Sequence, residues 1–547
     1  MMDISQKIKL SFPGTGTEIT AEKDETLLDA ARRGNIQIPA ACSGKGICGK
    51  CKVRMLKGSG GEITEDEKRM LTAEEMAAGI RLACCIRLSA DIEAELLTYD
   101  SAAANKKTEV IMPDDFRPEP ADAEELGAAF DIGTTTVVGM VWDLHTGKLA
   151  GVAAKVNYQN IFGADVISRI QYVGGNQTHA LEMQQKVISC MNDILDEISK
   201  TGSVDTGRIM KVRIDGNTTM THLVLKVSPY TLSRYPFEPV FTGMQTAKAA
   251  DLGLHVNDDA DIRTLPLIAG HVGSDITAME AAIDIEKLPG CTVALDIGTN
   301  GEVVAGKDGQ LVTCSTAAGP AFEGATIKCG MRAASGAIEA VSITKDHLLV
   351  YTIENEKAVG ICGSGLIDCI AQLLSSGLLN FKGKLCTRQE ALDNGINPEV
   401  ADHLQGGEDG MQIELADGVI LTQKDIREVQ LAKGAILAGT QTLMKELGFT
   451  EKDIDRIIIA GAFGSYIRKE SALAIGLIPE VPAEKIISAG NAAGTGVCMA
   501  LLSQSVQDRI VHLAGVTRHI ELSKNMDFQN YYMEAMFYPR RWDAHER

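Results

Sequence analysis

The chain has 547 residues, of which 45% are hydrophobic and 23% charged, and its 53 basic and 73 acidic residues give a net charge of −20. This length exceeds one ordinary hydrophobic core and predicts three or more domains, and the acidic balance argues against a nucleic-acid partner. No apolar run is long enough for a transmembrane helix, and the first residues lack the apolar stretch of a signal peptide. Without export, the 13 cysteines indicate reduced thiols or metal ligands in the cytoplasm.

The first chemical motif is a glycine-rich cysteine loop, PAACSGKGICGKCKVRML. Cys42, Cys48 and Cys51 follow the spacing C-x5-C-x2-C, and RLACCIRL supplies Cys84 and Cys85 further on. A close triplet of thiolates with one distant cysteine is typical of a 2Fe–2S cluster. The glycines would let the backbone wrap around the cluster and aim N–H groups at its sulfurs. A structural zinc site and a redox dithiol are the alternatives, but the first favours two CxxC knuckles and the second lacks its βαβ context.

The elements around this loop suggest a β-grasp module. KIKLSF and TEIT predict a hairpin, DETLLDAARRG a capped helix and CKVRML a strand. Residues 3 to 98 resemble ferredoxins, with a loop closer to the adrenodoxin type than to the plant type. In that family the last ligand lies in a Leu-Ala-Cys context, which Cys84 matches. The resemblance therefore implies Cys42, Cys48, Cys51 and Cys84 as cluster ligands and leaves Cys85 as a neighbour; we expect the domain to span residues 1–98.

A linker and an internal repeat follow. Residues 99–126 mix charge, prolines and little periodicity, which predicts a linker. Beyond it, FDIGTTTV and LDIGTNGEV each end an apolar strand in Asp-Ile-Gly-Thr and return as a second strand. IDGNTTM and AGAFGSYI form a second pair, each a strand, a glycine-containing loop and a helix. The duplication predicts two homologous α/β lobes that face one cleft, at residues 127–290 and 291–547.

The repeated hairpins have the residue types of a phosphate site. A strand that ends in Asp-x-Gly-Thr places a carboxylate beside small residues whose backbone N–H groups can cradle phosphate. The carboxylate would hold a hydrated Mg²⁺ that bridges phosphate oxygens. One such turn is also an ordinary connection between strands, but two in matched repeats favour a nucleotide site. No P-loop motif is present.

The repeats resemble the superfamily of acetate and sugar kinases, heat-shock chaperones and actin, with two ribonuclease-H-like lobes. The resemblance implies ATP bound by two phosphate hairpins and an adenosine motif. The implied residues are Asp131, Gly133, Thr134 and Thr135 in the first hairpin, Asp296, Gly298, Thr299 and Asn300 in the second, and Gly461, Ala462, Phe463 and Gly464 in the adenosine motif.

Two further acidic residues are candidates for positioning the water that attacks the γ-phosphate. Glu302 lies beside the second hairpin, and Glu323 follows a Gly-Pro-Ala turn in STAAGPAFEGATIKCGM. A surface or capping role is the alternative for either. In SAGNAAGTGVCMAL, Gly494 and Gly496 either approach the nucleotide or serve helix packing.

The two modules together indicate delivery of an electron to an acceptor that ordinary donors reduce poorly. A plain electron carrier needs no nucleotide site, and a metabolite kinase needs no cluster. Plant-type clusters lie near about −400 mV. An acceptor about 180 mV lower requires about 4 kcal/mol of differential binding between its states, which an ATP-driven clamp of two lobes could supply.

Residues 3 to 540 resemble the reductive activators of corrinoid proteins, through FDIGTTTV, FGADVISRI, GNTTMTHL, ALDIGTNGE, GPAFEGA, GSGLID and GAFGSYI. The resemblance implies a 2Fe–2S cluster, ATP and Mg²⁺, used to return Co(II) to Co(I) in a corrinoid protein of a methyltransferase or O-demethylase system. It also implies an upstream low-potential electron donor and a homodimer. Two alternatives stay open: an ATP-dependent activator of another low-potential enzyme, and a redox-sensing, chaperone-like ATPase.

Overall fold

The computed structural model describes residues 7–13, 16–34, 36, 38, 40, 44, 46, 49–97, 110–121, 125–202, 204–464 and 466–540. The chain separates into two units, and each is described by itself. The first unit comprises Met1–Asp100 with Asn157–Gly174, and the second comprises Ser101–Val156 with Gly175–Arg547.

The first unit is built on a five-stranded mixed sheet with the order β2-β1-β5-β3-β4. Its strands are β1 (Ile8–Phe12), β2 (Thr17–Ala21), β3 (Lys52–Lys57), β4 (Ile80–Leu82) and β5 (Ile92–Leu96). Its helices are α1 (Leu27–Arg33), α2 (Glu65–Met70), α3 (Ala73–Ala77) and α5 (Val166–Val173), with the 3-10 turn η2 (Tyr158–Ile161). The expected hairpin, capped helix and strand are confirmed as β1–β2, α1 and β3.

Sequence explains why the helices of this unit begin where they do. The side chains of Thr26, Thr64 and Thr72 each accept a hydrogen bond from a backbone N–H in the first turn of α1, α2 and α3. Apolar residues alternate along β1, so that Leu10 lies in a core with Leu27 of α1, and both are fully buried. The sheet and α1 therefore hold the two ends of the cysteine loop.

The first lobe of the second unit has a six-stranded sheet with the order β10-β11-β9-β6-β7-β8. Its strands are β6 (Leu126–Ile132), β7 (Thr136–Asp143), β8 (Lys148–Val156), β9 (Ile209–Gly216), β10 (Gln245–Ala247) and β11 (Asp261–Thr264). Its helices are α6 (Gln177–Gly202), α7 (Thr218–Val224), α8 (Ala249–Leu252) and α9 (Ser274–Ala282).

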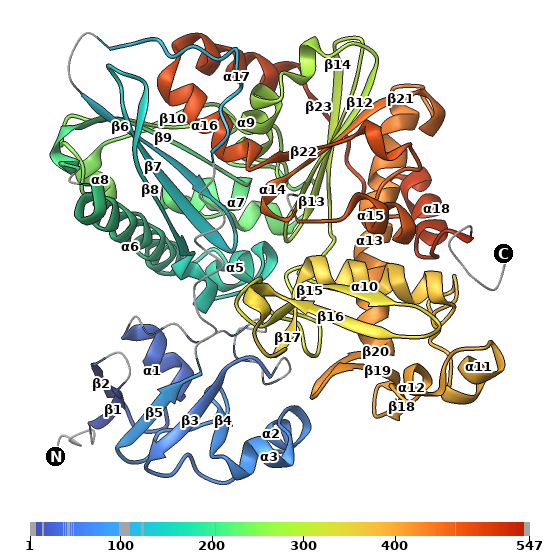
Figure 1. Cartoon of the computed structure of the whole chain (residues 1–547). Helices are drawn as coiled ribbons and strands as arrows, with labels where there is room; N and C mark the ends of the chain where they lie inside the picture. The colour runs from blue at the N-terminus through green and yellow to red at the C-terminus, as the bar shows by residue number, and fades with distance from the viewer. Residues whose placement is uncertain are drawn as a thin grey trace. The chain divides into compact units, whose positions relative to one another are not determined.

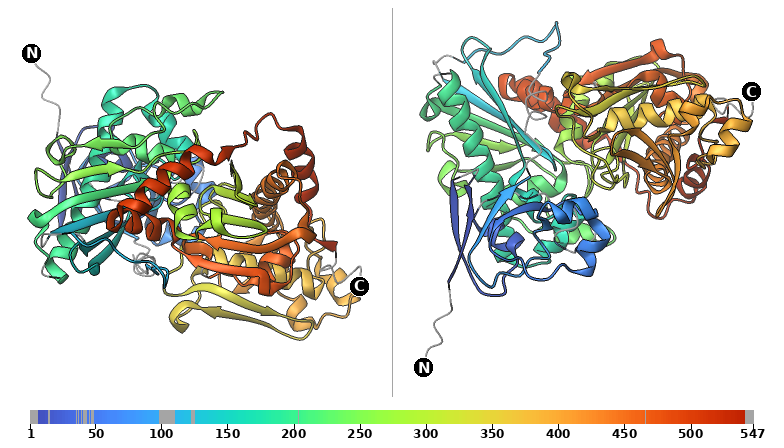
Figure 2. Two further views of the ribbon diagram at one scale, coloured as in Figure 1. Left: turned by 90° about the horizontal axis from the view of Figure 1, so that it is seen from above. Right: turned by 60° about the horizontal axis from the view of Figure 1, so that its bottom comes forward.

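The second lobe has a matching six-stranded sheet with the order β22-β21-β12-β13-β14-β23. Its strands are β12 (Cys291–Ile297), β13 (Gly301–Lys307), β14 (Gln310–Thr316), β21 (Ile454–Ala460), β22 (Ile486–Gly490) and β23 (Arg518–His519). Its helices are α13 (Gln423–Glu446), α14 (Gly461–Gly464), α15 (Lys469–Ile475), α16 (Ala492–Leu502), α17 (Gln504–Val516) and α18 (Met526–Ala535). Figures 1 and 2 show both lobes.

Two smaller sheets extend the second lobe. They contain β15 (Ala337–Ile343), β16 (Leu348–Thr352) and β17 (Gly360–Ile361), and then β18 (Leu404–Gly407), β19 (Gly410–Ala416) and β20 (Val419–Thr422). The helices beside them are α10 (Gly363–Ser376), α11 (Arg388–Asp393) and α12 (Pro398–Ala401). The helix expected in GSGLIDCIAQLL is confirmed as α10.

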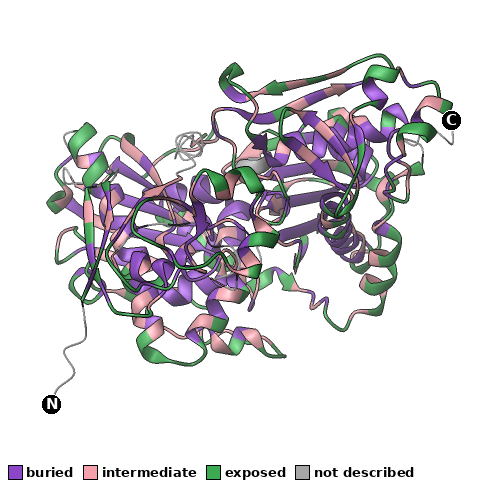
Figure 3. Cartoon of the chain, turned by 90° about the horizontal axis from the view of Figure 1, so that it is seen from below, coloured by how far each residue is buried: buried purple, intermediate pink, exposed green. Residues whose placement is uncertain are grey.

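The two large sheets repeat one arrangement, which confirms the predicted duplication. In each, an antiparallel hairpin (β6–β7 or β12–β13) pairs in parallel with a strand that precedes a helix (β9 or β21). β6 and β12 are buried at every position except one, and that position is Asp131 in β6 and Asp296 in β12. Figure 3 shows buried strands, in purple, in both lobes. Asp131 and Asp296 are the partly exposed positions of β6 and β12.

Helices α16 and α17 come late in the chain but pack on the first lobe. Ala492, Val497 and Leu501 share a core with Ala129 of β6 and Met279 of α9. Both views of Figure 2 show these red helices against the first lobe. The last segments of the chain therefore join the two lobes through a shared apolar core.

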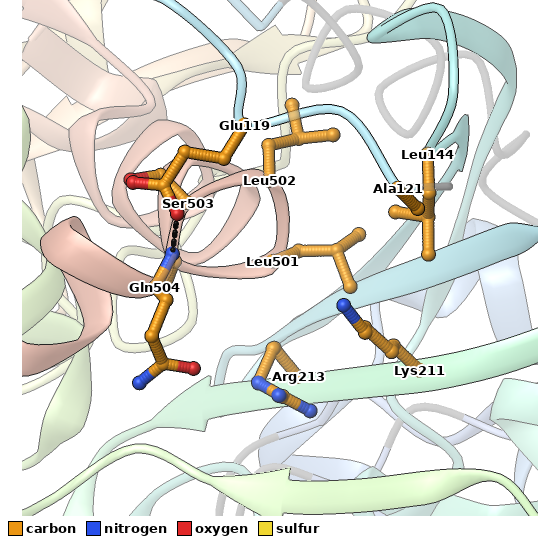
Figure 4. A pocket seen from close by; sticks show the side chains of 10 residues that line it. Glu119, Ala121, Leu144, Lys211, Arg213, Leu501, Leu502, Ser503 and Gln504 are labelled. Carbon is orange, nitrogen blue, oxygen red and sulfur yellow. Dashed lines mark hydrogen bonds between the residues drawn. The ribbon is translucent and has the colours of Figure 1, made fainter. Parts of the chain in front are cut away.

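The described part of the linker, residues 110–121, is fastened to the second unit. The carboxylate of Glu119 accepts hydrogen bonds from the backbone N–H of Gln504 at 3.0 Å and from Ser503 Oγ at 2.7 Å, at the start of α17. These bonds lower the pKa of Glu119 to about 2. Figure 4 shows the pocket at this contact, which Lys211 and Arg213 also line; it contains none of the predicted site residues.

None of the helices that the structure describes combines the length and the apolar character that crossing a bilayer requires.

Candidate functional site

The structure brings two of the four predicted cluster ligands together. Cys51 is buried at the start of β3, Cys84 follows β4, and their Sγ atoms are 3.3 Å apart. Cys42 and Cys48 lie outside the described residues. Two thiols at this separation, held by neighbouring strands, can bind the same small inorganic group.

The cysteine loop needs its glycines. Gly44, Gly46 and Gly49 have φ values of +88°, +73° and +64°, which side chains other than glycine rarely adopt. A Cβ atom on Gly44 would lie 3.8 Å from Cys84 Cβ, so the loop passes close to that thiol. The residues present therefore fit a cluster enclosed by backbone, as the spacing of the cysteines predicts.

Cys85 differs from Cys84 in its surroundings. Its Sγ lies 3.8 Å from Cys84 Sγ, and burial raises the pKa of its thiol to about 11. A cluster ligand has to be a thiolate. Binding to a metal removes the proton of a thiol, so the choice of Cys84 over Cys85 rests on the Leu-Ala-Cys context and the contact with Cys51, and the ligand assignment stays a prediction.

The two hairpins of the second unit have related turns, and the turn of the first hairpin is one residue longer. After Asp131, the backbone N–H of Gly133 donates to the carbonyl of Thr136 at 3.0 Å. After Asp296, the backbone N–H of Gly298 donates to the carbonyl of Asn300 at 2.9 Å. In the first hairpin, Thr134 Oγ1 also accepts a hydrogen bond of 2.9 Å from the amide of Asn217, just after β9.

Glu323 bridges the two hairpins. One carboxylate oxygen accepts a hydrogen bond of 2.9 Å from Thr135 Oγ1, and the other accepts one of 2.8 Å from Thr299 Oγ1. The turn that carries Glu323 is held by its own backbone N–H, which donates to the carbonyl of Pro320, and by the buried ring of Phe322. Of the two acidic candidates, Glu323 is thus the one between the lobes.

Glu302 lies deeper in the second lobe. It is opposite Asp296 in the antiparallel register of β12 and β13, is 8% exposed, and accepts a hydrogen bond of 3.0 Å from Ser315 Oγ. Burial, followed by the nearby carboxylates of Asp275 and Asp296, raises the pKa of Glu302 well above its usual range.

The predicted adenosine motif forms the short helix α14 at the end of β21. Gly461, which has a φ of +82°, lies so close to Asp296 that a Cβ atom would be 2.4 Å from its Oδ1. Gly464 is buried against Ile459 of β21, and Ala462 and Phe463 complete the helix between the two glycines. The motif and the second hairpin therefore meet at Asp296.

The second glycine loop is tied to the first hairpin. Asn491 caps α16 by accepting from the backbone N–H of Gly494, and its amide donates to Asp131 Oδ2 at 3.0 Å. A Cβ atom on Gly496 would lie 2.0 Å from the carbonyl oxygen of Ala278 in α9. Gly496 therefore serves close packing between α16 and α9, whereas Gly494 lies at the cap beside the hairpin.

Two carboxylates of this region, those of Asp215 and Asp275, were not predicted from the sequence. Asp215 lies beside Asp131 in the parallel register of β6 and β9; it is fully buried, and within the part of the chain that the structure describes neither of its carboxylate oxygens has a hydrogen-bond partner. Asp275 is in the first turn of α9. Burial is the largest cause that raises the pKa of each, and the Asp131 and Asp296 carboxylates add to it. The signal available was an aspartate inside the apolar strand of IDGNTTM, since buried charges are rare.

Asp131, Asp215, Asp275, Asp296 and Glu302 are here called the carboxylate cluster. Carboxylates this close repel one another unless a cation or protons offset the charge. Among the described residues no group of three or more His, Cys, Asp or Glu side chains is arranged to hold a metal ion by itself. A hydrated Mg²⁺ needs only one or two carboxylates, because it keeps several waters.

Comparison with known proteins identifies all three parts of the chain. Residues 11–89 match the model of the 2Fe–2S iron–sulfur cluster binding domain, residues 126–288 that of the RACo middle region, and residues 290–546 that of the C-terminal domain of RACo, the ASKHA domain. A 2Fe–2S binding domain joined to an ASKHA region, the fold of actin and sugar kinases, defines the class and confirms the predicted fold.

Relatives over the whole length narrow this class to one family. The corrinoid activation enzyme RamQ of Eubacterium limosum is 31% identical over 97% of this chain and 99% of its own. The [Co(II) methylated amine-specific corrinoid protein] reductase of Methanosarcina barkeri is 28% identical over 51% of this chain and 52% of its own. The solved structure of a reductive activator for a corrinoid, iron-sulfur protein aligns with a TM-score of 0.70 and 30% identity, covering 98% of this chain and 99% of the other. The chain belongs to the RACo family of reductive activators of corrinoid proteins.

Proposed function

We propose that this protein uses ATP to return the cobalt of a corrinoid protein from Co(II) to Co(I) by one-electron transfer. The observation that carries the proposal is the bridge from Glu323 to Thr135 and Thr299, because it ties two phosphate-type hairpins into one site. The family assignment supports the choice of acceptor.

The first unit would hold the redox group. We assign Cys51 and Cys84, with Cys42 and Cys48, as the ligands of a 2Fe–2S cluster, since the first two thiols already lie 3.3 Å apart. When bound, such a cluster supplies one electron at low potential. Gly44, Gly46 and Gly49, with their positive φ values, would bring backbone N–H groups to it.

The second unit would hold the nucleotide between its lobes. Backbone N–H groups of Gly133–Thr135 and Gly298–Asn300 would bind phosphate oxygens. Asp131 and Asp296 would orient Mg²⁺ through its water shell. Gly461–Gly464 would receive the adenosine, and the absence of a side chain at Gly461 leaves room beside Asp296.

Glu323 is the better of the two candidates for positioning the attacking water. A general base has to be ionised, and burial raises the pKa of Glu302 well above its usual range, which disfavours the ionised form. Glu323 instead accepts two hydroxyl hydrogen bonds, which suit a carboxylate. A phosphate that enters between the hairpins would compete with Glu323 for the hydroxyls of Thr135 and Thr299. Nucleotide binding would therefore change the hydrogen bonds that connect the two hairpins.

ATP binding and hydrolysis would be coupled to electron transfer through the acceptor protein. Reduction of an acceptor about 180 mV below the cluster needs about 4 kcal/mol of differential binding between its states. We propose that the ATP-bound lobes supply it by binding the corrinoid protein in the state that is easier to reduce. The same proposal includes an upstream low-potential electron donor, a homodimer and a cytoplasmic location. It also includes domain boundaries at residues 98, 126 and 290.

The test is reduction of a purified, oxidised corrinoid protein by the full chain with a chemical reductant, Mg²⁺ and ATP. We expect the Co(II) spectrum to disappear only when ATP is present. Equal reduction without ATP would contradict the coupling. ATP-driven electron transfer to a different low-potential enzyme, with none to corrinoid, would contradict the acceptor.

A further inference from the structure

Arg332 is a positively charged residue close to Glu323, and the proposed nucleotide site gives Arg332 no role. Its side chain is exposed, and yet burial is the largest cause that lowers the pKa of its guanidinium, with the charge of Glu323 opposing this effect. No hydrogen bond or ion pair fastens this guanidinium to the described residues, apart from its electrostatic interaction with Glu323.

The backbone that carries Arg332 is fixed. The preceding residue, Met331, is 8% exposed, and its backbone N–H donates to the carbonyl of Ile361 in β17 at 2.9 Å. Gly324, directly after Glu323, packs so tightly here that a Cβ atom would lie 2.6 Å from Met331 N. The backbone next to Glu323 therefore packs against the backbone next to Arg332, and these contacts hold the Cα atoms of the two residues near each other.

The carboxylate cluster at the two hairpins, which Glu323 joins, calls for a cation. The neighbours that raise the pKa of Asp215, Asp275 and Glu302 electrostatically are carboxylates in every case. A triphosphate brought to the hairpins would add negative charge to this cluster. Mg²⁺ offsets part of it, and a guanidinium adds a fixed charge with a planar fork of donors that matches phosphate oxygens.

We propose that Arg332 binds the terminal phosphate of the nucleotide and is a catalytic residue for its hydrolysis. This inference rests on the proposed function. Water attacks the γ-phosphorus, a new P–O bond forms, and the bond from phosphorus to the β–γ bridging oxygen breaks. The proton of the water passes by way of Glu323 to solvent, and the products are ADP and inorganic phosphate. Arg332 stays protonated and stabilises the charge on the transferred group.

Two variants and a control test this role in the full chain. R332A should lower kcat for ATP hydrolysis about 10³-fold, the lower end of the effect of arginines that contact a transferring phosphate. It should weaken MgATP binding about tenfold and leave MgADP binding within about twofold, since only ATP has the terminal phosphate. R332K keeps the charge without the fork and should recover part of kcat. R388A removes a cation from an exposed ion pair with Asp402 and should leave hydrolysis unchanged.

The outcomes separate the inference from the proposed function. If R332A hydrolyses ATP as fast as the wild type, or weakens MgATP and MgADP equally, the role of Arg332 is wrong and the ATPase stands. If the wild type itself neither binds nor hydrolyses ATP, the proposed function fails first. An unchanged melting temperature and an unchanged cluster spectrum in R332A and R332K exclude unfolding as the cause of a loss.

Discussion

Thr135 donates a hydrogen bond of 2.9 Å to the carboxylate of Glu323, a residue 188 positions later in the chain. Thr299 donates to the other carboxylate oxygen at 2.8 Å. Each hydroxyl belongs to one of the duplicated hairpins, so a single carboxylate holds both turns at a set spacing. A buried or half-buried carboxylate with two such donors is costly to replace, because one hydroxyl loses its acceptor.

The first prediction concerns this bridge. Glu323→Gln keeps the size of the side chain but replaces one acceptor oxygen with an amide NH₂ and removes the charge. We expect kcat for ATP hydrolysis to fall about 10²-fold or more, the usual effect of losing a general base. Steady-state phosphate release measures it. Thr299→Ser, which keeps the hydroxyl, is the matched control and should retain most of the activity; a Glu323→Gln variant within twofold of the wild type would contradict the assignment.

The second prediction concerns the hairpin aspartates. Asp131→Asn and Asp296→Asn remove the charge that we assign to Mg²⁺ and keep the amide near the size of the carboxylate. We expect each to suppress ATP hydrolysis at least about 10²-fold at a fixed Mg²⁺ concentration, while the absorption of the cluster stays unchanged. Asp308→Asn, in the exposed turn between β13 and β14 with a φ of +50°, is the control because asparagine tolerates that conformation. Full activity in both hairpin variants would rule out the two-hairpin site.

The third prediction concerns the cysteine loop. Cys84 Sγ lies 3.3 Å from Cys51 Sγ, and Cys85 Sγ lies 3.8 Å from Cys84 Sγ. Cys84→Ser should therefore lose or strongly change the EPR signal of the reduced cluster, and Cys85→Ser should keep it. Both variants change one sulfur for oxygen at adjacent positions, so each is the control for the other. The reverse result would exchange the two assignments.

Local patterns predicted the duplicated hairpins and the capped helix α1, because a strand that ends in Asp-Ile-Gly-Thr or a threonine cap is encoded within a few residues. Partners far apart in the chain were not predictable in the same way. Nothing near Glu323 in the sequence specifies that both Thr135 and Thr299 donate to it. Every residue of helix α16 is buried, so its sequence has no separate apolar face that would predict its packing on the first lobe.

The same distinction explains the missed carboxylates. Asp131 and Asp296 were found because each occurs in a repeated motif. Asp215 and Asp275 become part of the cluster only through the pairing of β9 with β6 and through the start of α9 beside them. An aspartate in an apolar strand is a signal of function, but the sequence alone gives neither its neighbours nor the sign of its pKa shift.

His222 in α7 offers a pH dependence that is independent of catalysis. It is fully buried and stacks on Phe241 with ring centroids 4.3 Å apart. Its Nε2 accepts from the backbone N–H of Val240 at 3.0 Å, so Nδ1 carries the proton and donates to the carbonyl of Thr218 at 2.8 Å. Protonation of Nε2 would break the first bond and bury a charge, and burial lowers the pKa of His222 to about 4.

The fourth prediction follows from this shift. Between pH 6.5 and about 4 the unfolded chain binds a proton at His222 that the folded chain does not, so the free energy of unfolding falls as the pH falls through that window. The neutral, buried His222 makes its full contribution to the free energy of unfolding above pH 6.5, and about 3 kcal/mol of that contribution is lost by pH 4. Urea unfolding, followed by the fluorescence of the buried Trp142 in a Trp542→Phe background, measures it. His222→Gln should flatten this pH dependence, whereas His512→Gln, at an exposed histidine paired with Glu286, should leave it as in the wild type. Equal slopes in His222→Gln and the wild type would show that His222 does not titrate in the folded protein as its contacts require.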